Sequence, residues 1–121
     1  MKPVMVNGEV WNVRRVSPGD PLLVDRTGNM RIATTDPSTR TVNIASNVTP
    51  PLLDQVMLHE MAHAITVSHG LLGPLRAQLP PELWVLVEEW AVELVEKYSI
   101  EAIMLTSESL GRPLCIRGYC I

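Results

Sequence analysis

The segment LLDQVMLHEMAHAITVS, residues 52–68, decides how this 121-residue chain is interpreted. It contains neither glycine nor proline and is apolar on most sides, so we predict one buried helix over residues 52–68 that Gly70 ends. One polar stripe runs down this helix, because its polar residues follow at intervals of four, four and three: Gln55, His59, His63 and Thr66. Buried imidazoles without partners are costly, so the stripe is expected to face a cleft, a hydrogen-bond network or a metal ion.

The spacing within the stripe favours a metal ion. His59-Glu60-Met61-Ala62-His63 is an HExxH motif, and two histidines four residues apart lie on the same face of a helix. Both rings can therefore bind one Zn²⁺. Glu60 points in an adjacent direction, where it can act as the general base that takes a proton from a zinc-activated water.

A hydrolytic zinc site needs a third protein ligand, and the sequence leaves three candidates open. Glu88 is favoured because its helical neighbours are apolar, whereas Glu89 is surrounded partly by other glutamates. His69 stands ten residues after His59, where the longer HExxHxxGxxH motif has its last ligand. The glycine of that motif is replaced here by Thr66, and His69 also suits the C-terminal end of a helix.

A second helix is expected from Leu83 at least to Lys97, and it can extend to Ser109 before Gly111 and Pro113. Apolar residues recur along it at helical spacing, which predicts one stripe facing the core: Leu83, Val87, Trp90, Leu94 and Tyr98.

The first 48 residues are typical of β-structure, with short β-branched segments between strong turn signals. Asn7-Gly8 predicts a two-residue hairpin, and four or five short antiparallel strands are expected in all. The fold class is therefore α+β, with a small N-terminal antiparallel sheet packed on two main helices in a single domain, 1–121. The strand Thr41–Ala45 is a candidate edge on which an extended peptide could pair.

The amino-acid composition disfavours two classes of binding partner. Ten Lys and Arg against thirteen Asp and Glu give a formal net charge of −3, which argues against nucleic acid or an anionic membrane as partner. No apolar segment is long enough to span a membrane, and no secretory signal is visible. We therefore expect a cytoplasmic protein in which Cys115 and Cys120 are reduced, although a hairpin around Arg117-Gly118 could bring the two thiols together.

The HExxH motif followed by Glu88-Glu89-Trp90-Ala91-Val92-Glu93-Leu94 resembles the small gluzincin-type metallopeptidases of the ImmA/IrrE kind and their relatives from phages and mobile elements. The resemblance implies a zincin-like fold in which strands precede the HExxH helix. It also implies His59, His63 and Glu88 as zinc ligands. Many relatives have Asn or Asp four residues after the ligand Glu; that position is Val92 here, and it would be Glu93 if Glu89 were the ligand.

These observations predict a zinc-dependent metallopeptidase, a hydrolase that cleaves a peptide bond in a protein or peptide substrate with Glu60 as general base. The alternative is a catalytically inactive, zinc-stabilised protein-interaction module, because a chain of 121 residues leaves little room for a long substrate groove.

Overall fold

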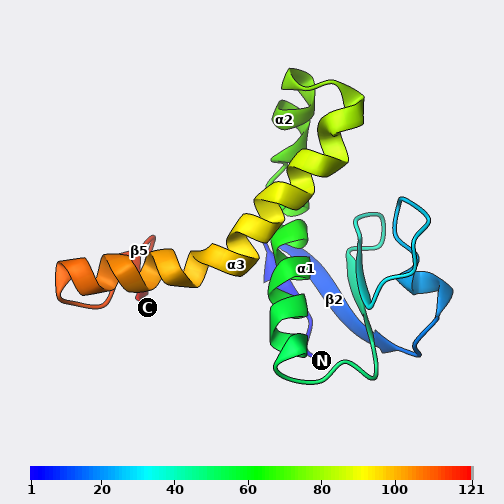
Figure 1. Ribbon diagram of the computed structural model, residues 1–121, viewed down its shortest axis with the longest axis horizontal. Coiled ribbons are helices and arrows are strands. Elements are labelled where there is room, and N and C mark those ends of the chain that lie inside the picture. The colour runs from blue at the N-terminus through cyan, green and yellow to red at the C-terminus, as the bar shows by residue number, and fades with distance from the viewer. Residues whose placement is uncertain (121) are drawn as a thin grey trace.

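The N-terminal half forms a four-stranded sheet on which the first long helix packs (Figure 1). The computed structural model describes residues 1–120. Its order of strands is β1-β2-β4-β3, and their bounds are β1 Val4–Val6, β2 Glu9–Val16, β3 Ala33–Asp36 and β4 Thr41–Ala45. The α+β class is confirmed.

The sheet is mixed, so the prediction of an antiparallel sheet is wrong. β1 and β2 do form the predicted hairpin, with positive φ at Asn7 (48°) and Gly8 (79°), and β3 pairs antiparallel with β4. β2 and β4, however, run parallel. After β2 the chain crosses over through a short 3₁₀ helix, η1 (Pro21–Leu23), and returns along β3. Turn signals report only on adjacent segments, so they do not reveal that β4 inserts beside β2.

The insertion also decides which strand has a free edge. β4 (Thr41–Ala45) lies between β2 and β3 with every residue buried, so the prediction that it offers an edge is wrong. The edge strands are β1 and β3, and β3 is the one beside β4. β3 also contacts the HExxH helix. The backbone N–H of Ala45 donates to the carbonyl of Ile32, and hydrogen-bonded positions alternate along an antiparallel pair. The backbone groups of Ala33 and Thr35 therefore point to the free edge.

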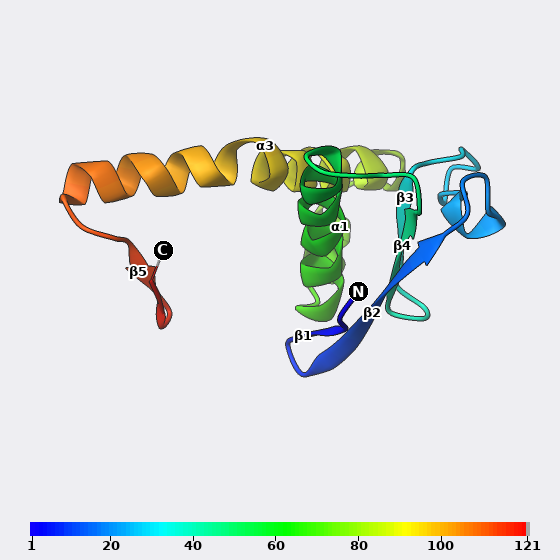
Figure 2. The same cartoon turned by 90° about the horizontal axis from the view of Figure 1, so that it is seen from below.

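Three α-helices follow: α1 (Leu52–Ser68), α2 (Leu72–Gln78) and α3 (Trp84–Leu110). α1 has the predicted bounds, and Gly70, at φ 65°, follows its last turn. The short α2 was not predicted, because it contains Gly73-Pro74; this proline lies in the first turn, where a missing N–H is tolerated. A second 3₁₀ helix, η2 (Pro81–Leu83), leads into α3, which crosses α1 and extends past it (Figure 2).

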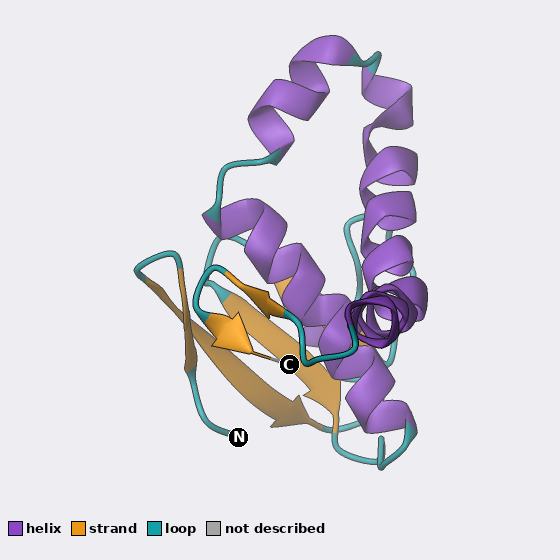
Figure 3. Ribbon diagram, turned by 90° about the vertical axis from the view of Figure 1, so that its left-hand side faces the viewer, coloured by secondary structure: helices purple, strands orange, loops and turns teal. Residues whose placement is uncertain are grey.

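The hydrophobic core lies between α1 and the sheet, and Figure 3 shows α1 lying across the strands. Its buried members come mainly from β2, β3 and β4, with Ala64 from α1: Trp11, Val13, Val16, Leu23, Ala33, Val42, Ile44, Ala45, Val48 and Ala64. The indole of Trp11 is fully buried, and its Nε1 donates to the hydroxyl of Ser68 at 2.6 Å. This bond fixes the C-terminal end of α1 to β2.

We expect Ser68→Ala to lower the free energy of unfolding by about 1–3 kcal/mol, because the buried Trp11 Nε1–H would lose its acceptor. The measurement is urea unfolding followed by Trp fluorescence and circular dichroism. Ser46→Ala is the control: Ser46 is exposed, so its removal should change the free energy of unfolding by less than about 0.5 kcal/mol. Equal effects of the two variants would contradict a structural role for this bond.

The apolar stripe predicted on α3 does not face the core. Trp90 is 65% exposed, Tyr98 is 55% exposed, and the buried residues of the helix are Glu88 and Val92. The prediction is wrong because α3 turns its carboxylates, and not its apolar stripe, toward the histidines of α1.

The chain ends in a small hairpin of β5 (Cys115–Ile116) and β6 (Tyr119–Cys120). Its turn is the one the sequence indicated, and Cys115 and Cys120 form a disulfide, so the expectation of reduced thiols is wrong. The cytoplasmic location stays a prediction. Within residues 1–120, none of the helices is both long and apolar enough to cross a membrane.

Candidate metal centre

The polar stripe of α1 faces the glutamates of α3. His59 and His63 lie one turn apart on α1 with their ring centroids 5.1 Å apart, as the HExxH spacing predicts. Their side chains are 22% and 10% exposed, so the two rings are largely withdrawn from water. Gln55, one turn earlier, donates to Glu96 on α3 at 2.8 Å. Thr66, the last residue of the stripe, instead bonds back to the carbonyl of His63.

Glu89 brings a carboxylate to the two imidazoles. Its Oε1 lies 3.1 Å from Nε2 of His63, and its Oε2 lies 3.4 Å from Nε2 of His59. One ligand atom from each of His59, His63 and Glu89 lies within 4.8 Å of the other two, so the three side chains could hold one metal ion. This is the only such group of three found among residues 1–120.

The Nδ1 atom of each imidazole ring also lies against a carboxylate. Nδ1 of His59 is 2.7 Å from Oε2 of Glu96, and Nδ1 of His63 is 2.9 Å from Oε2 of Glu88. A carboxylate on Nδ1 fixes the orientation of the ring and turns the other nitrogen toward the ion in many metalloproteins. Here both Nε2 atoms are turned toward Glu89.

Glu88, which we expected to be the third ligand, occupies a different position. Its carboxylate lies against Nδ1 of His63 and accepts from the Arg26 guanidinium, with Oε2 2.5 Å from Nη2. The side chain is only 5% exposed, so the sequence correctly indicated a buried carboxylate. Its partner Arg26, 62 positions earlier in the chain, was missed, because no local pattern links the two residues.

His69, the other alternative, is the exposed C-cap residue of α1 and lies outside the three-residue group. Its position matches the helix-end role that the sequence also allowed. Glu96 was missed as well. The signal that could have found it is the spacing of seven from Glu89, which puts both carboxylates on the same face of α3.

The carboxylates shift the protonation of the whole group. The hydrogen bond to Glu89, aided by Glu96, raises the pKa of His59 to about 8 despite burial. Burial opposes the charge on His63, but Glu88 and Glu89 outweigh it and raise its pKa to about 9. The two histidines hold the pKa of Glu89 far below its usual range. Below pH 8 a metal ion therefore has to displace protons from both rings.

Glu60 lies on the sheet side of the histidines and is 7% exposed. The hydroxyl of Thr35, on β3, contacts both its Oε2 and its backbone carbonyl. Burial raises the pKa of Glu60, while Thr35, His63 and His59 act in the opposite direction. The result is a carboxylate with an elevated pKa, a property suited to a group that takes and returns a proton.

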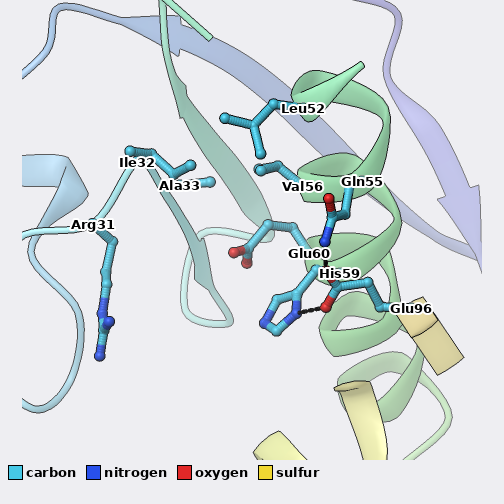
Figure 4. A pocket seen from close by; sticks show the side chains of 9 residues that line it. All are labelled: Arg31, Ile32, Ala33, Leu52, Gln55, Val56, His59, Glu60 and Glu96. Carbon is cyan, nitrogen blue, oxygen red and sulfur yellow. Dashed lines mark hydrogen bonds and ion pairs between the residues drawn. The ribbon is translucent and has the colours of Figure 1, made fainter. Parts of the chain in front are cut away.

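A pocket of about 230 Å³ opens between α1 and the start of β3 (Figure 4). Glu60 and His59 point into it from α1, and the chain leading into β3 forms the opposite wall: Arg31, Ile32 and Ala33. The volume is below the roughly 300–1,000 Å³ of sites that enclose a drug-sized ligand, so it suits one or two side chains of a longer molecule.

Comparison with known proteins found no protein-family model, no curated protein and no solved structure that matches this chain.

Proposed function

We propose that this chain is a zinc-dependent peptidase whose metal ligands are His59, His63 and Glu89. The observation that carries the proposal is the orientation of the rings: Glu96 and Glu88 hold the two Nδ1 atoms, and both Nε2 atoms face the carboxylate of Glu89.

The donor set fits zinc. Two imidazoles and one carboxylate are a ligand combination of hydrolytic zinc sites, which keep a fourth position open. When bound, zinc supplies a Lewis acid that polarises a carbonyl group and lowers the pKa of water. Glu88 enters the proposal as the group that orients His63, in place of the ligand role that the resemblance implied.

Glu60 is proposed as the catalytic base. Its carboxylate points into the pocket beside His59, takes a proton from the attacking water and passes it to the nitrogen of the leaving amine. Thr35 keeps the side chain in place by donating to Oε2. The raised pKa of Glu60 makes it a stronger base than an exposed glutamate, and so better able to hold the proton between the two transfers.

The edge of β3 is proposed to bind the peptide backbone. The outward N–H and C=O groups of Ala33 and Thr35 can pair with an extended substrate, as in other cases of strand addition. A peptide lying there runs along the pocket that His59 and Glu60 line, which places its backbone next to the base.

The first test combines metal analysis with a cleavage assay. We expect one zinc per chain by elemental analysis, and cleavage of a mixed peptide library that a chelator abolishes and added zinc restores. Stoichiometric zinc without cleavage of any library peptide would instead support the non-catalytic, zinc-stabilised interaction module. A chain that binds no zinc would contradict both the peptidase and the zinc-stabilised interaction module.

A further inference from the structure

Arg31 lies on the pocket wall opposite α1, two residues before the start of β3 (Figure 4). Two contacts fix it. Its backbone N–H donates to the carbonyl of Leu23 at 2.8 Å, and Leu23 belongs to the buried core. Its Nε donates to Oδ2 of Asp25 at 2.7 Å. The backbone of Arg31 and the Nε atom of its side chain are therefore both held in place by hydrogen bonds.

The acceptor of that bond is itself fixed by a tight loop. The other oxygen of Asp25, Oδ1, accepts from the backbone N–H of Thr27 at 2.8 Å, from the Thr27 hydroxyl at 2.6 Å and from the N–H of Asn29 at 3.0 Å. The Thr27 hydroxyl and then Arg31 hold the pKa of Asp25 well below its usual range, so it stays ionised at neutral pH. Oδ2 is thus a permanent acceptor for Arg31.

The outer end of the guanidinium has no such partner. Within residues 1–120, the guanidinium of Arg31 forms one side-chain hydrogen bond, which Nε donates to Asp25. The Arg31 side chain is 56% exposed. Nη1 and Nη2 of this pocket-lining residue are therefore left as a pair of donors for another acceptor. Such a pair matches the two oxygens of a carboxylate.

Apart from His59, which is assigned to the metal site, the remainder of the pocket would not attract a negative group. Its other lining side chains are apolar or acidic, apart from Gln55 and His59: Ile32, Ala33, Leu52, Val56, Glu60 and Glu96. Arg31 is the only lysine or arginine among the described residues that line it. The nearby Arg26 is already engaged by Glu88 and Glu89.

We propose that Arg31 binds a carboxylate of the peptide substrate, so that this site prefers peptides carrying a negative charge next to the reacting bond. The inference rests on the proposed peptidase function. The carboxylate can belong to an aspartate or glutamate side chain or to a free C-terminus, and both present the same two oxygens to the Nη atoms.

The test measures binding of peptide hydroxamates to the zinc-loaded protein by calorimetry, which requires no turnover. The two probes of the first pair both end in a C-terminal amide, and they differ at one residue, which is glutamate in one probe and glutamine in the other. This residue is placed at each position of the peptide in turn. The other pair is uncharged in its side chains and ends in a free carboxylate or an amide. We expect one charged probe to bind about tenfold to a hundredfold more tightly than its neutral partner, as for a bidentate Arg–carboxylate contact. The pair that shows the difference identifies the source.

Arg31→Gln should abolish the difference, whereas Arg31→Lys should keep part of it because the charge remains without the fork. Arg31→Glu should reverse the charge preference, so that a probe carrying lysine binds more tightly than the same probe carrying glutamine. Loss of a purely structural contact would not produce this reversal. The matched control is Arg40→Gln: Arg40 is also exposed and bonded to an acid, Glu9, at 2.8 Å, but it does not line the pocket.

Equal binding of charged and neutral probes to the unmodified protein would overturn the role of Arg31 and leave the metal site intact. Failure of every hydroxamate to bind would overturn the peptidase proposal together with the inference that depends on it.

Discussion

Glu60→Gln is expected to lower the rate of peptide cleavage by ~10²–10⁴-fold, the range typical of a lost general base. Zinc should stay bound, because Glu60 lies outside the group formed by His59, His63 and Glu89. The amide matches the carboxylate in size and can still accept from the Thr35 hydroxyl, so the packing of this buried side chain should be preserved. The amide cannot take up the proton of the attacking water.

The measurement is kcat for one cleaved peptide, with zinc content determined on the same samples. Glu101→Gln is the matched control, since Glu101 is exposed on α3, away from the histidines. It should leave both quantities unchanged. Activity retained in Glu60→Gln would exclude Glu60 as the base, and zinc lost from it would show that Glu60 takes part in holding the metal.

The second large effect is expected at Glu89. Structural zinc sites bind with about 10–16 kcal/mol. Divided over four ligands, that is about 2.5–4 kcal/mol each, so Glu89→Gln should weaken zinc binding by roughly 10²–10³-fold. Glu88→Gln should weaken it by only about 10–100-fold, as for a group that orients a ligand.

Comparing these neighbours side by side decides which of them is the ligand. Zinc affinity is measured by competition with a chromophoric chelator, and circular dichroism of the metal-free variants reports on folding. Glu88 is 5% exposed and lies 2.5 Å from Arg26, whereas Glu89 is 38% exposed and lies 3.6 Å from it. Replacement of Glu88 should therefore destabilise the metal-free chain more than replacement of Glu89. A larger loss of zinc affinity in Glu88→Gln would identify Glu88 as the ligand and contradict the assignment made here.

The sequence predicted the parts of the site that depend on local spacing. The HExxH pair and the bounds of α1 follow from periodicity within one segment, and the structure places them as expected. Choosing between Glu88 and Glu89 is harder, because one residue on a helix is a rotation of about 100°. The apolar neighbours of Glu88 correctly indicated burial, but its burial is balanced by Arg26 and His63, and no local pattern reveals the arginine.

The errors in the predicted fold also arise because local sequence patterns do not reveal contacts between distant segments. Turn signals located the β1–β2 hairpin, but the parallel pairing of β2 with β4 depends on a crossover that brings distant segments together. The stripe on α3 has sound helical spacing, and its apolar character alone suggested a buried face. The helix is instead oriented by its charged residues, which pair with α1, and Trp90 is left in solvent.

The attachment of α3 has a consequence for how the molecule responds to metal. No α3 residue belongs to the core between α1 and the sheet, and Val92 is its one buried apolar side chain among the described residues. Its hydrogen bonds and ion pairs with α1 are those of Glu88, Glu89 and Glu96 with the two histidines, and that of Glu96 with Gln55. A ligand that binds only the docked arrangement stabilises it by mass action. Zinc would therefore act as a cross-link between two helices, and its binding would strengthen the docking of α3 beyond what the carboxylate–imidazole pairs provide.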